Sequence, residues 1–174
     1  MDASPVLTPI VAPGLRVLFV GINPGLRSAA TGHNFAGHGN RFWATLHAAG
    51  FTPRRLAPEE DALLPSFGLG LVNLVDRPTR AASELSRDEL VAGGATLERT
   101  VRTSAPRLVA MVGVTAYRVA FARPRAAMGL QAEPLGGRPV WILPNPSGLN
   151  AHYTPADLAR AYAEARAHAG SLSG

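Results

Sequence analysis

The chain has 174 residues, of which 47% are apolar, and it carries a formal charge of +5 with a pI of about 10.9. All 17 cationic side chains are arginine, because the sequence contains no lysine. The sequence also contains no cysteine. This composition excludes a side-chain Schiff base, a lysine-containing phosphate loop, disulfides, thiolate catalysis and cysteine-ligated metal sites. The positive charge favours a polyanionic partner such as nucleic acid, although a genome of biased base composition would also encode an arginine-rich, lysine-free chain.

The length and apolar content predict one domain over residues 1–174, with short flexible tails at about residues 1–11 and 170–174. The N-terminal residues lack a basic start followed by an apolar run, and no stretch approaches the length of a membrane span. We therefore expect a cytoplasmic, monomeric protein without a membrane partner.

Four nearly continuous apolar runs alternate with helical patterns along the chain, and such runs are typical of strands covered on both faces. The runs span residues 15–21, 69–75, 107–112 and 139–143. The helical patterns span residues 41–49, 86–103, 114–121 and 155–168, the second and fourth opening with cap signals at Ser86 and Thr154. This alternation predicts an α/β fold, a three-layer α/β/α sandwich around a central four-stranded, mostly parallel sheet.

Two loops that follow apolar runs contain the dipeptide Asn-Pro, at Asn23-Pro24 and at Asn145-Pro146. Proline stiffens such a loop and holds the preceding residue in an extended conformation. A single Asn-Pro-Gly is most often an ordinary turn. Two such loops at equivalent places favour a binding site at the carboxyl ends of the parallel strands.

These loops and other segments closely resemble the mismatch-specific uracil-DNA glycosylases, relatives of thymine-DNA glycosylase. The resemblance covers about residues 12–163, with the family's order and approximate spacing. It rests on residues 18–26 (LFVGINPGL), Ser28, residues 31–32 (TG), Phe35, residues 40–43 (NRFW), 74–79 (LVDRPT), 92–94 (AGG) and 143–149 (LPNPSGL).

The resemblance implies an enzyme that flips uracil out of double-stranded DNA and hydrolyses its N-glycosidic bond, without a cofactor or metal, leaving an abasic site for base excision repair. It implies preference for G:U mismatches, with other damaged pyrimidines as further substrates. The family's catalytic asparagine matches Asn23, whose amide oxygen orients a water but is too weak a base to take its proton. Related enzymes with a stronger hydrolytic step have aspartate there and histidine in place of Asn145, so we expect a slower enzyme.

The flipped base is expected to stack on Phe35, although the residue type alone would also fit an ordinary core aromatic. Backbone N–H groups near Ile22 and Phe35 would hold the carbonyl oxygens of the leaving base. Ser28, Asn73 and Asn145 are the other expected base-binding residues.

Leu149 is expected to act as an apolar wedge that fills the space left by the flipped base. The surrounding loop, Ser147, Gly148, Asn150 and His152, would contact DNA. Where a close relative has Ser-Arg after the wedge, this chain reads Asn150-Ala151-His152, so the arginine expected to bind the widowed guanine is missing. Either His152 or the backbone of residues 148–150 would replace it, and we expect loosened selectivity for the opposite base.

Asp76 is the one carboxylate in a matched motif directly after a predicted strand. It would assist water activation or stabilise the sugar cation if it faces the pocket, and it is structural if it pairs with Arg77 or caps a turn. The expected phosphate contacts are Arg41, Arg77 and Arg80, and His33 and His38 flank Phe35 in a loop that would touch DNA or be solvated. The histidines lack metal-ligand spacing, so no metal site is expected.

Two other functions fit parts of the sequence. A non-catalytic nucleotide- or DNA-binding module would use the same strand-end loops, and a nucleoside hydrolase would act on free nucleosides, although the acid-rich, metal-binding loop that it needs is missing. If the chain is a glycosylase, the lack of lysine predicts hydrolysis without strand scission, because strand-cutting glycosylases usually attack the sugar with an amine.

Overall fold

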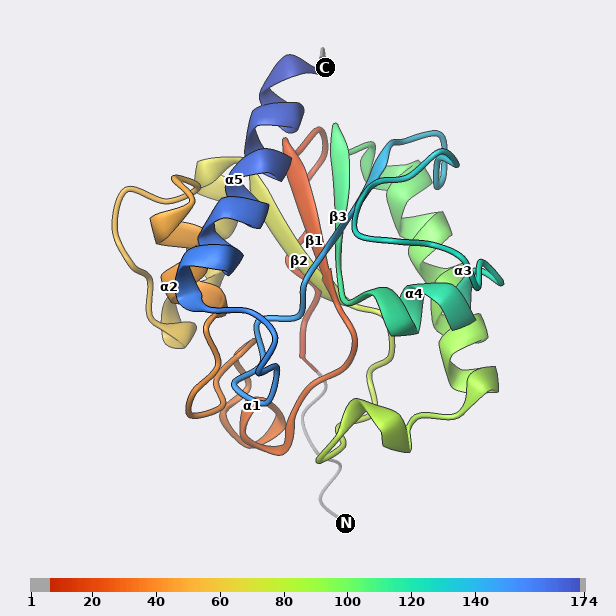
Figure 1. Cartoon of the computed structure of the whole chain (residues 1–174), viewed down its shortest axis with the longest axis horizontal. Helices are drawn as coiled ribbons and strands as arrows, with labels where there is room; N and C mark the ends of the chain where they lie inside the picture. The colour runs from red at the N-terminus through yellow and green to blue at the C-terminus, as the bar shows by residue number, and fades with distance from the viewer. Residues whose placement is uncertain (1–6, 173–174) are drawn as a thin grey trace.

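A five-stranded sheet forms the centre of the computed structural model, which describes residues 7–172 (Figure 1). The strand order is β2-β1-β3-β5-β4, and all neighbouring pairs are parallel except β4 with β5. The strands are β1 Val17–Gly21, β2 Leu69–Asn73, β3 Leu108–Val112, β4 Gly129–Leu130 and β5 Val140–Leu143. The four parallel strands match the four predicted runs. The edge strand β4 adds a fifth, which is too short to leave a periodic pattern in the sequence.

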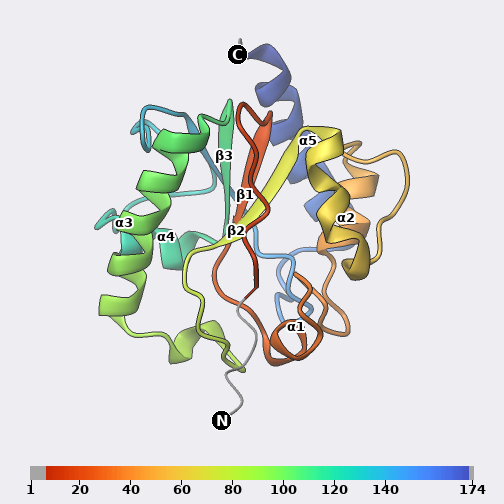
Figure 2. The same cartoon turned by 180° about the vertical axis from the view of Figure 1, so that it is seen from behind.

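Helices cover both faces of the sheet, which confirms the three-layer α/β/α arrangement. Figure 2 shows α2 and α5 on one face, with α3 and α4 on the other. The helices are α1 Leu26–Thr31, α2 Phe42–Ala48, α3 Arg87–Ser104, α4 Val114–Ala120 and α5 Pro155–Ser171, with 3-10 segments η1 Pro58–Phe67 and η2 Ala82–Glu84. The sequence patterns predicted α2, α3, α4 and α5 but not α1, η1 or η2.

The two predicted helix starts are capped as expected. Ser86 Oγ accepts a hydrogen bond from the Glu89 N–H at 3.1 Å, and the Ser86 N–H donates to Glu89 Oε1 at 3.0 Å. Thr154 and Asp157 make the same reciprocal pair at the start of α5. The Thr154 N–H lowers the pKa of Asp157, because it stabilises the carboxylate.

Strand β1 is buried along its whole length, and its side chains enter two separate cores. Phe19 packs between the sheet and the α2–α5 layer, where its ring meets that of Phe42 edge-to-face at 5.5 Å. Leu18 and Val20 point to the opposite face and pack with the helix α3 residue Leu97. The continuous apolar run therefore reflects burial on both faces of the strand.

The Ala92-Gly93-Gly94 motif allows helix α3 to pack closely against its neighbours. A Cβ atom at Gly93 would lie 2.1 Å from the Leu74 carbonyl oxygen, and one at Gly94 would lie 3.1 Å from the Ala120 carbonyl oxygen. Larger residues at Gly93 would push α3 away from the loop that follows β2.

The described ends of the chain are tied to the fold more closely than the expected tails suggested. Ile10 pairs with Leu71 through two backbone hydrogen bonds of 2.9 and 3.0 Å, and Leu7 is buried. Helix α5 continues through Gly170 to Ser171. The flexibility of the tails stays a prediction, and residues 1–6 and 173–174 of the expected tails lie outside the described residues. None of the described helices has the length and apolarity needed to cross a membrane.

Candidate active site

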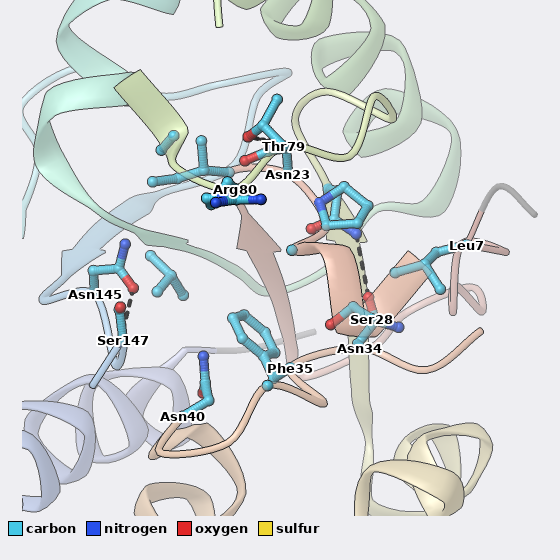
Figure 3. A pocket seen from close by; sticks show the side chains of 17 residues that line it. Leu7, Asn23, Ser28, Asn34, Phe35, Asn40, Thr79, Arg80, Asn145 and Ser147 are labelled. Atoms are coloured by element: carbon cyan, nitrogen blue, oxygen red, sulfur yellow. Dashed lines mark hydrogen bonds between the residues drawn. The ribbon is translucent and has the colours of Figure 1, made fainter. Parts of the chain in front are cut away.

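A cavity opens at the carboxyl ends of the parallel strands, on the side where α1 lies and away from the last turns of helix α5 (Figure 1). Its wall is built by the loops that follow β1, β2 and β5, and Figure 3 shows these side chains surrounding one space. The cavity brings together the predicted residues Ile22, Asn23, Ser28, Phe35, Asn73, Asn145 and Ser147.

The side-chain amide of Asn23 is held in one orientation. Its Nδ2 donates to the Arg77 carbonyl oxygen and to Thr79 Oγ1, both at 2.8 Å. A carbonyl oxygen only accepts, and Thr79 Oγ1 uses its own hydrogen on the Ala81 carbonyl at 2.8 Å, so only the NH2 group of Asn23 fits on this side. Asn23 Oδ1 has no hydrogen-bond partner among residues 7–172, which leaves an acceptor for a water in the cavity.

Phe35 presents its ring to the cavity from a strained loop position with φ of 49°. The ring stacks on Phe42 at 4.2 Å with an interplanar angle of 23°. Ser28 Oγ accepts from the Ala36 N–H at 3.1 Å and so ties helix α1 to this loop. Phe35 is therefore a rigid, half-buried aromatic face, attached to the core but open to the cavity.

Gly21, at the end of β1, provides the space in which the cavity residues meet. A Cβ atom there would lie 2.7 Å from Asn73 Oδ1 and 3.3 Å from Phe35 Cζ. Real Cβ atoms do not approach a neighbour at 2.7 Å, so any larger residue would displace Asn73. The lack of space in the cavity wall therefore requires glycine at this position, although residues of any type could adopt its φ.

Asn145 shapes the loop after β5. Its Oδ1 accepts from the Ser147 N–H at 3.0 Å, and its carbonyl oxygen accepts from Asn150 Nδ2 at 3.0 Å. The loop presents Leu149 with 89% of its surface exposed, more than any other large apolar side chain of the described residues. Gly148 allows the loop to contact the Phe35 loop, because a Cβ atom there would lie 2.8 Å from the Gly39 carbonyl oxygen.

Arg41 is engaged inside the protein, whereas the sequence predicted a phosphate contact. Its guanidinium donates to the carbonyl oxygens of Tyr153, Ser147 and Asn150 at 2.6, 2.8 and 3.0 Å. The Arg41 N–H also donates to the Pro146 carbonyl oxygen at 3.0 Å. Its side chain therefore holds the loop that carries Leu149, and the loop conformation that makes this possible has no local sequence signal.

The other two predicted phosphate contacts differ in their surroundings. Arg77 Nε donates to Glu89 Oε2 at 2.7 Å, and this ion pair holds the pKa of Glu89 at about 2. Arg80 lines the cavity near Asn23 and has neither a hydrogen bond nor an ion pair within residues 7–172 (Figure 3). Arg80 is thus available to an anion at the cavity mouth, and Arg77 is bound to a carboxylate.

Asp76 is exposed and does not line the cavity that contains Asn23. It lies in a neighbouring depression with Thr96 and Thr100, and its supposed partner Arg77 is bound to Glu89. The geometry therefore supports neither a role in the Asn23 cavity nor a pair with Arg77, and the Asp76 side chain makes no hydrogen bond within residues 7–172 that would cap a turn.

The predicted histidines are spread over different surfaces. His33 Nδ1 lies 3.3 Å from Asp61 Oδ1, while His38 is exposed and lines a separate groove that Phe35 also contacts. His152 is exposed at the end of the Leu149 loop, and its N–H donates to Asn150 Oδ1 at 3.4 Å. Only His152 shares a loop with the proposed wedge.

Sequence reasoning missed several cavity residues. Thr79 anchors the Asn23 amide, and Asn34 and Asn40 line the cavity beside Phe35 (Figure 3). Thr79 lies within the matched segment of residues 74–79, so its place in that motif could have identified it as a site residue. The sequence gives no indication that Asn34 contacts Asn73, because the two residues are 39 positions apart.

In a comparison with protein-family models, the model of the uracil DNA glycosylase superfamily matches residues 8–166, which include every cavity residue named above.

Proposed function

The chain belongs to the uracil DNA glycosylase superfamily, and on this basis we propose that it is a mismatch-specific member that hydrolyses the N-glycosidic bond of uracil flipped out of duplex DNA. Superfamily membership implies glycosylase activity in general. The observation that carries the narrower proposal is the Asn23 amide, whose nitrogen donates two hydrogen bonds while its oxygen has no partner within residues 7–172, in a cavity that Phe35 also lines.

In the proposed reaction the flipped base enters the cavity and lies on the Phe35 ring. The sugar then develops positive charge while the base departs with negative charge. Asn23 Oδ1 accepts a hydrogen bond from the attacking water and holds it against the sugar carbon; because the amide is too weak a base, the proton of the water passes to solvent or to the departing base anion as the new C–O bond replaces the N-glycosidic bond. The N–H groups of Ile22 and Phe35 would stabilise the charge that develops on the base oxygens. Asp76 has no part in this mechanism.

The proposed DNA-binding surface is the Leu149 loop together with Arg80. Leu149 would enter the base stack where the uracil has left it, and Ser147, Gly148 and Asn150 would support it. Arg80 would bind a phosphate near the flipped nucleotide. Arg41 belongs to the support of the loop and not to the phosphate contacts.

We propose G:U mismatches as substrates, with loosened selectivity for the opposite base. After the wedge, the His152 side chain is exposed and makes no hydrogen bond within residues 7–172, whereas Asn150 uses its Nδ2 and Oδ1 within the loop. We therefore expect comparable excision of uracil opposite adenine and opposite guanine. A strict requirement for guanine would overturn this part of the proposal.

The product is proposed to be an abasic site in an intact strand, since the chain offers no lysine amine to attack the sugar. The test uses a labelled duplex with a single uracil. Release of free uracil, with strand breaks only after alkali, would support the proposal. Breaks without alkali would contradict hydrolysis without scission, and binding to DNA without release of uracil would favour the non-catalytic module.

A further inference from the structure

Asp61 is a buried carboxylate outside the cavity, and the proposed reaction does not use it. It lies in η1 and only 6% of its surface is exposed. Its Oδ2 accepts from the Asn34 N–H at 3.0 Å and from Asn34 Nδ2 at 3.2 Å, and its Oδ1 lies 3.3 Å from His33 Nδ1. Burying a carboxylate is costly, so its partners on the Phe35 loop indicate a defined role.

The contacts of Asp61 set the direction of the next two amides. A carboxylate only accepts hydrogen bonds, so Asn34 must turn its NH2 group towards Asp61 and its Oδ1 away from it. Asn34 Oδ1 then accepts from Asn73 Nδ2 at 3.2 Å. Rotating the Asn73 amide by half a turn would require Asn34 to rotate too, which would place Asn34 Oδ1 against the Asp61 carboxylate.

Asn73 therefore offers the cavity a fixed donor and acceptor. One N–H of its Nδ2 and its Oδ1 have no partner among the described residues. Uracil carries an acceptor at O4 next to a donor at N3, and this order matches an amide that offers both groups. Cytosine carries a donor at N4 next to an acceptor at N3, so it would need the amide in the reversed orientation.

We propose that Asp61, acting through Asn34, is a positioning residue that locks the Asn73 amide in the orientation that accepts uracil and excludes cytosine. The inference rests on the proposed function, because it takes a flipped pyrimidine to be the occupant of the cavity. It adds Asp61 and Asn34 to the residues that determine base specificity, although neither matches a motif or lies near Asn73 in the sequence.

The test measures binding and not excision, because cytosine is a poor leaving group. Two duplexes carry a fluorinated sugar, which slows bond cleavage, at deoxyuridine in one and at deoxycytidine in the other, each opposite guanine. The ratio of the two Kd values includes the different costs of flipping the two bases. The flipping cost is a property of the DNA and is the same for the wild type and the variants. A change in the Kd ratio between wild type and variant therefore measures a change in base recognition by the cavity.

Two variants remove the lock in different ways. Asp61→Ala removes the acceptor that fixes the Asn34 amide, and Asn34→Ala removes the link itself while the residue 34 N–H can still bind Asp61. We expect both to reduce the preference for deoxyuridine over deoxycytidine by about tenfold or more, because the unlocked amide pairs with either base. Glu60→Ala is the matched control, since it removes the neighbouring carboxylate, which lies outside this chain of contacts, and its ratio should equal that of the wild type.

The outcomes separate the inference from the proposed function. If both variants weaken binding of the two duplexes equally, Asp61 only anchors the loop and the inference is overturned. Should Asp61→Ala fail to fold, as judged by circular dichroism, Asn34→Ala decides alone. A wild-type protein that binds the deoxyuridine duplex no more tightly than the deoxycytidine duplex would reject the proposed function itself, and the inference with it.

Discussion

Asn23 and Thr79 are 56 positions apart in the sequence, yet Asn23 Nδ2 donates to Thr79 Oγ1 at 2.8 Å. Thr79 in turn donates to the Ala81 carbonyl oxygen, so its hydroxyl has only an acceptor left for Asn23. This contact links the loop after β1 to the loop after β2. It determines which end of the Asn23 amide faces the cavity.

Replacing Thr79 with valine keeps the shape of the side chain but removes both hydrogen bonds. The Asn23 amide then loses one of its two anchors, and we expect kcat to fall by about tenfold with little change in KM. The free energy of unfolding should fall by about 1–3 kcal/mol, because buried polar groups lose their partners. Steady-state kinetics and denaturant titration check this, with Thr79→Ser as the control that restores the hydroxyl. Equal kcat values for the two variants would contradict the anchoring role.

Shortening Leu149 to alanine should impair base flipping without affecting stability. The side chain is 89% exposed, so its loss leaves no cavity in the protein. We expect uracil excision from duplex DNA to fall by about tenfold, which is the effect of losing about 1.4 kcal/mol of wedge contacts, and excision from single-stranded DNA to be unchanged. Val91→Ala, at an exposed apolar position on α3, serves as the control. A parallel loss on both substrates would argue against a wedge.

Replacing Arg41 with alanine should destabilise the protein and the Leu149 loop together. Three carbonyl oxygens lose a charged donor, so we expect the free energy of unfolding to drop by about 2–3 kcal/mol and duplex excision to fall as in the Leu149 variant. The salt dependence of DNA binding should stay as in the wild type, because the guanidinium does not face a phosphate. A reduced salt slope would instead support the phosphate contact expected from the sequence.

Arg80 and Arg77 form a matched pair for measuring phosphate contacts. The Arg80→Ala change should lower the slope of log K against log salt by about 0.9, as expected for one lost phosphate contact in duplex DNA. Arg77→Ala should leave the slope unchanged, because Arg77 is bound to Glu89. It should also raise the pKa of Glu89 from about 2 towards its ordinary value, measurable by NMR titration. Equal salt slopes for the two variants would contradict the assignment.

The sequence predicted the sheet and its covering helices because their signals are local. Five buried residues in β1 produce a continuous apolar run, and the caps at Ser86 and Thr154 mark helix starts within four positions. The two-residue strand β4 gives no such signal, since its place depends on pairing with β5.

Much of the site could also be predicted, because the strand-end loops carry the matched motifs. The sequence did not indicate the long-range partners. Arg41 was predicted to contact phosphate, and the structure shows that its guanidinium donates to the loop containing Ser147, more than 100 positions away. The contacts of Asp61 with the Phe35 loop depend in the same way on packing between distant segments, which single-sequence patterns do not encode.

The most direct test of the account is single-turnover excision of uracil by the wild type and by Asn23→Ala, with enzyme in excess over a labelled duplex. The wild type should release uracil and leave an alkali-sensitive strand. Asn23→Ala should bind the duplex with similar affinity but release uracil about a hundredfold more slowly, because the water is no longer held in place. Equal rates for the two proteins, or no release by the wild type, would contradict the central claim.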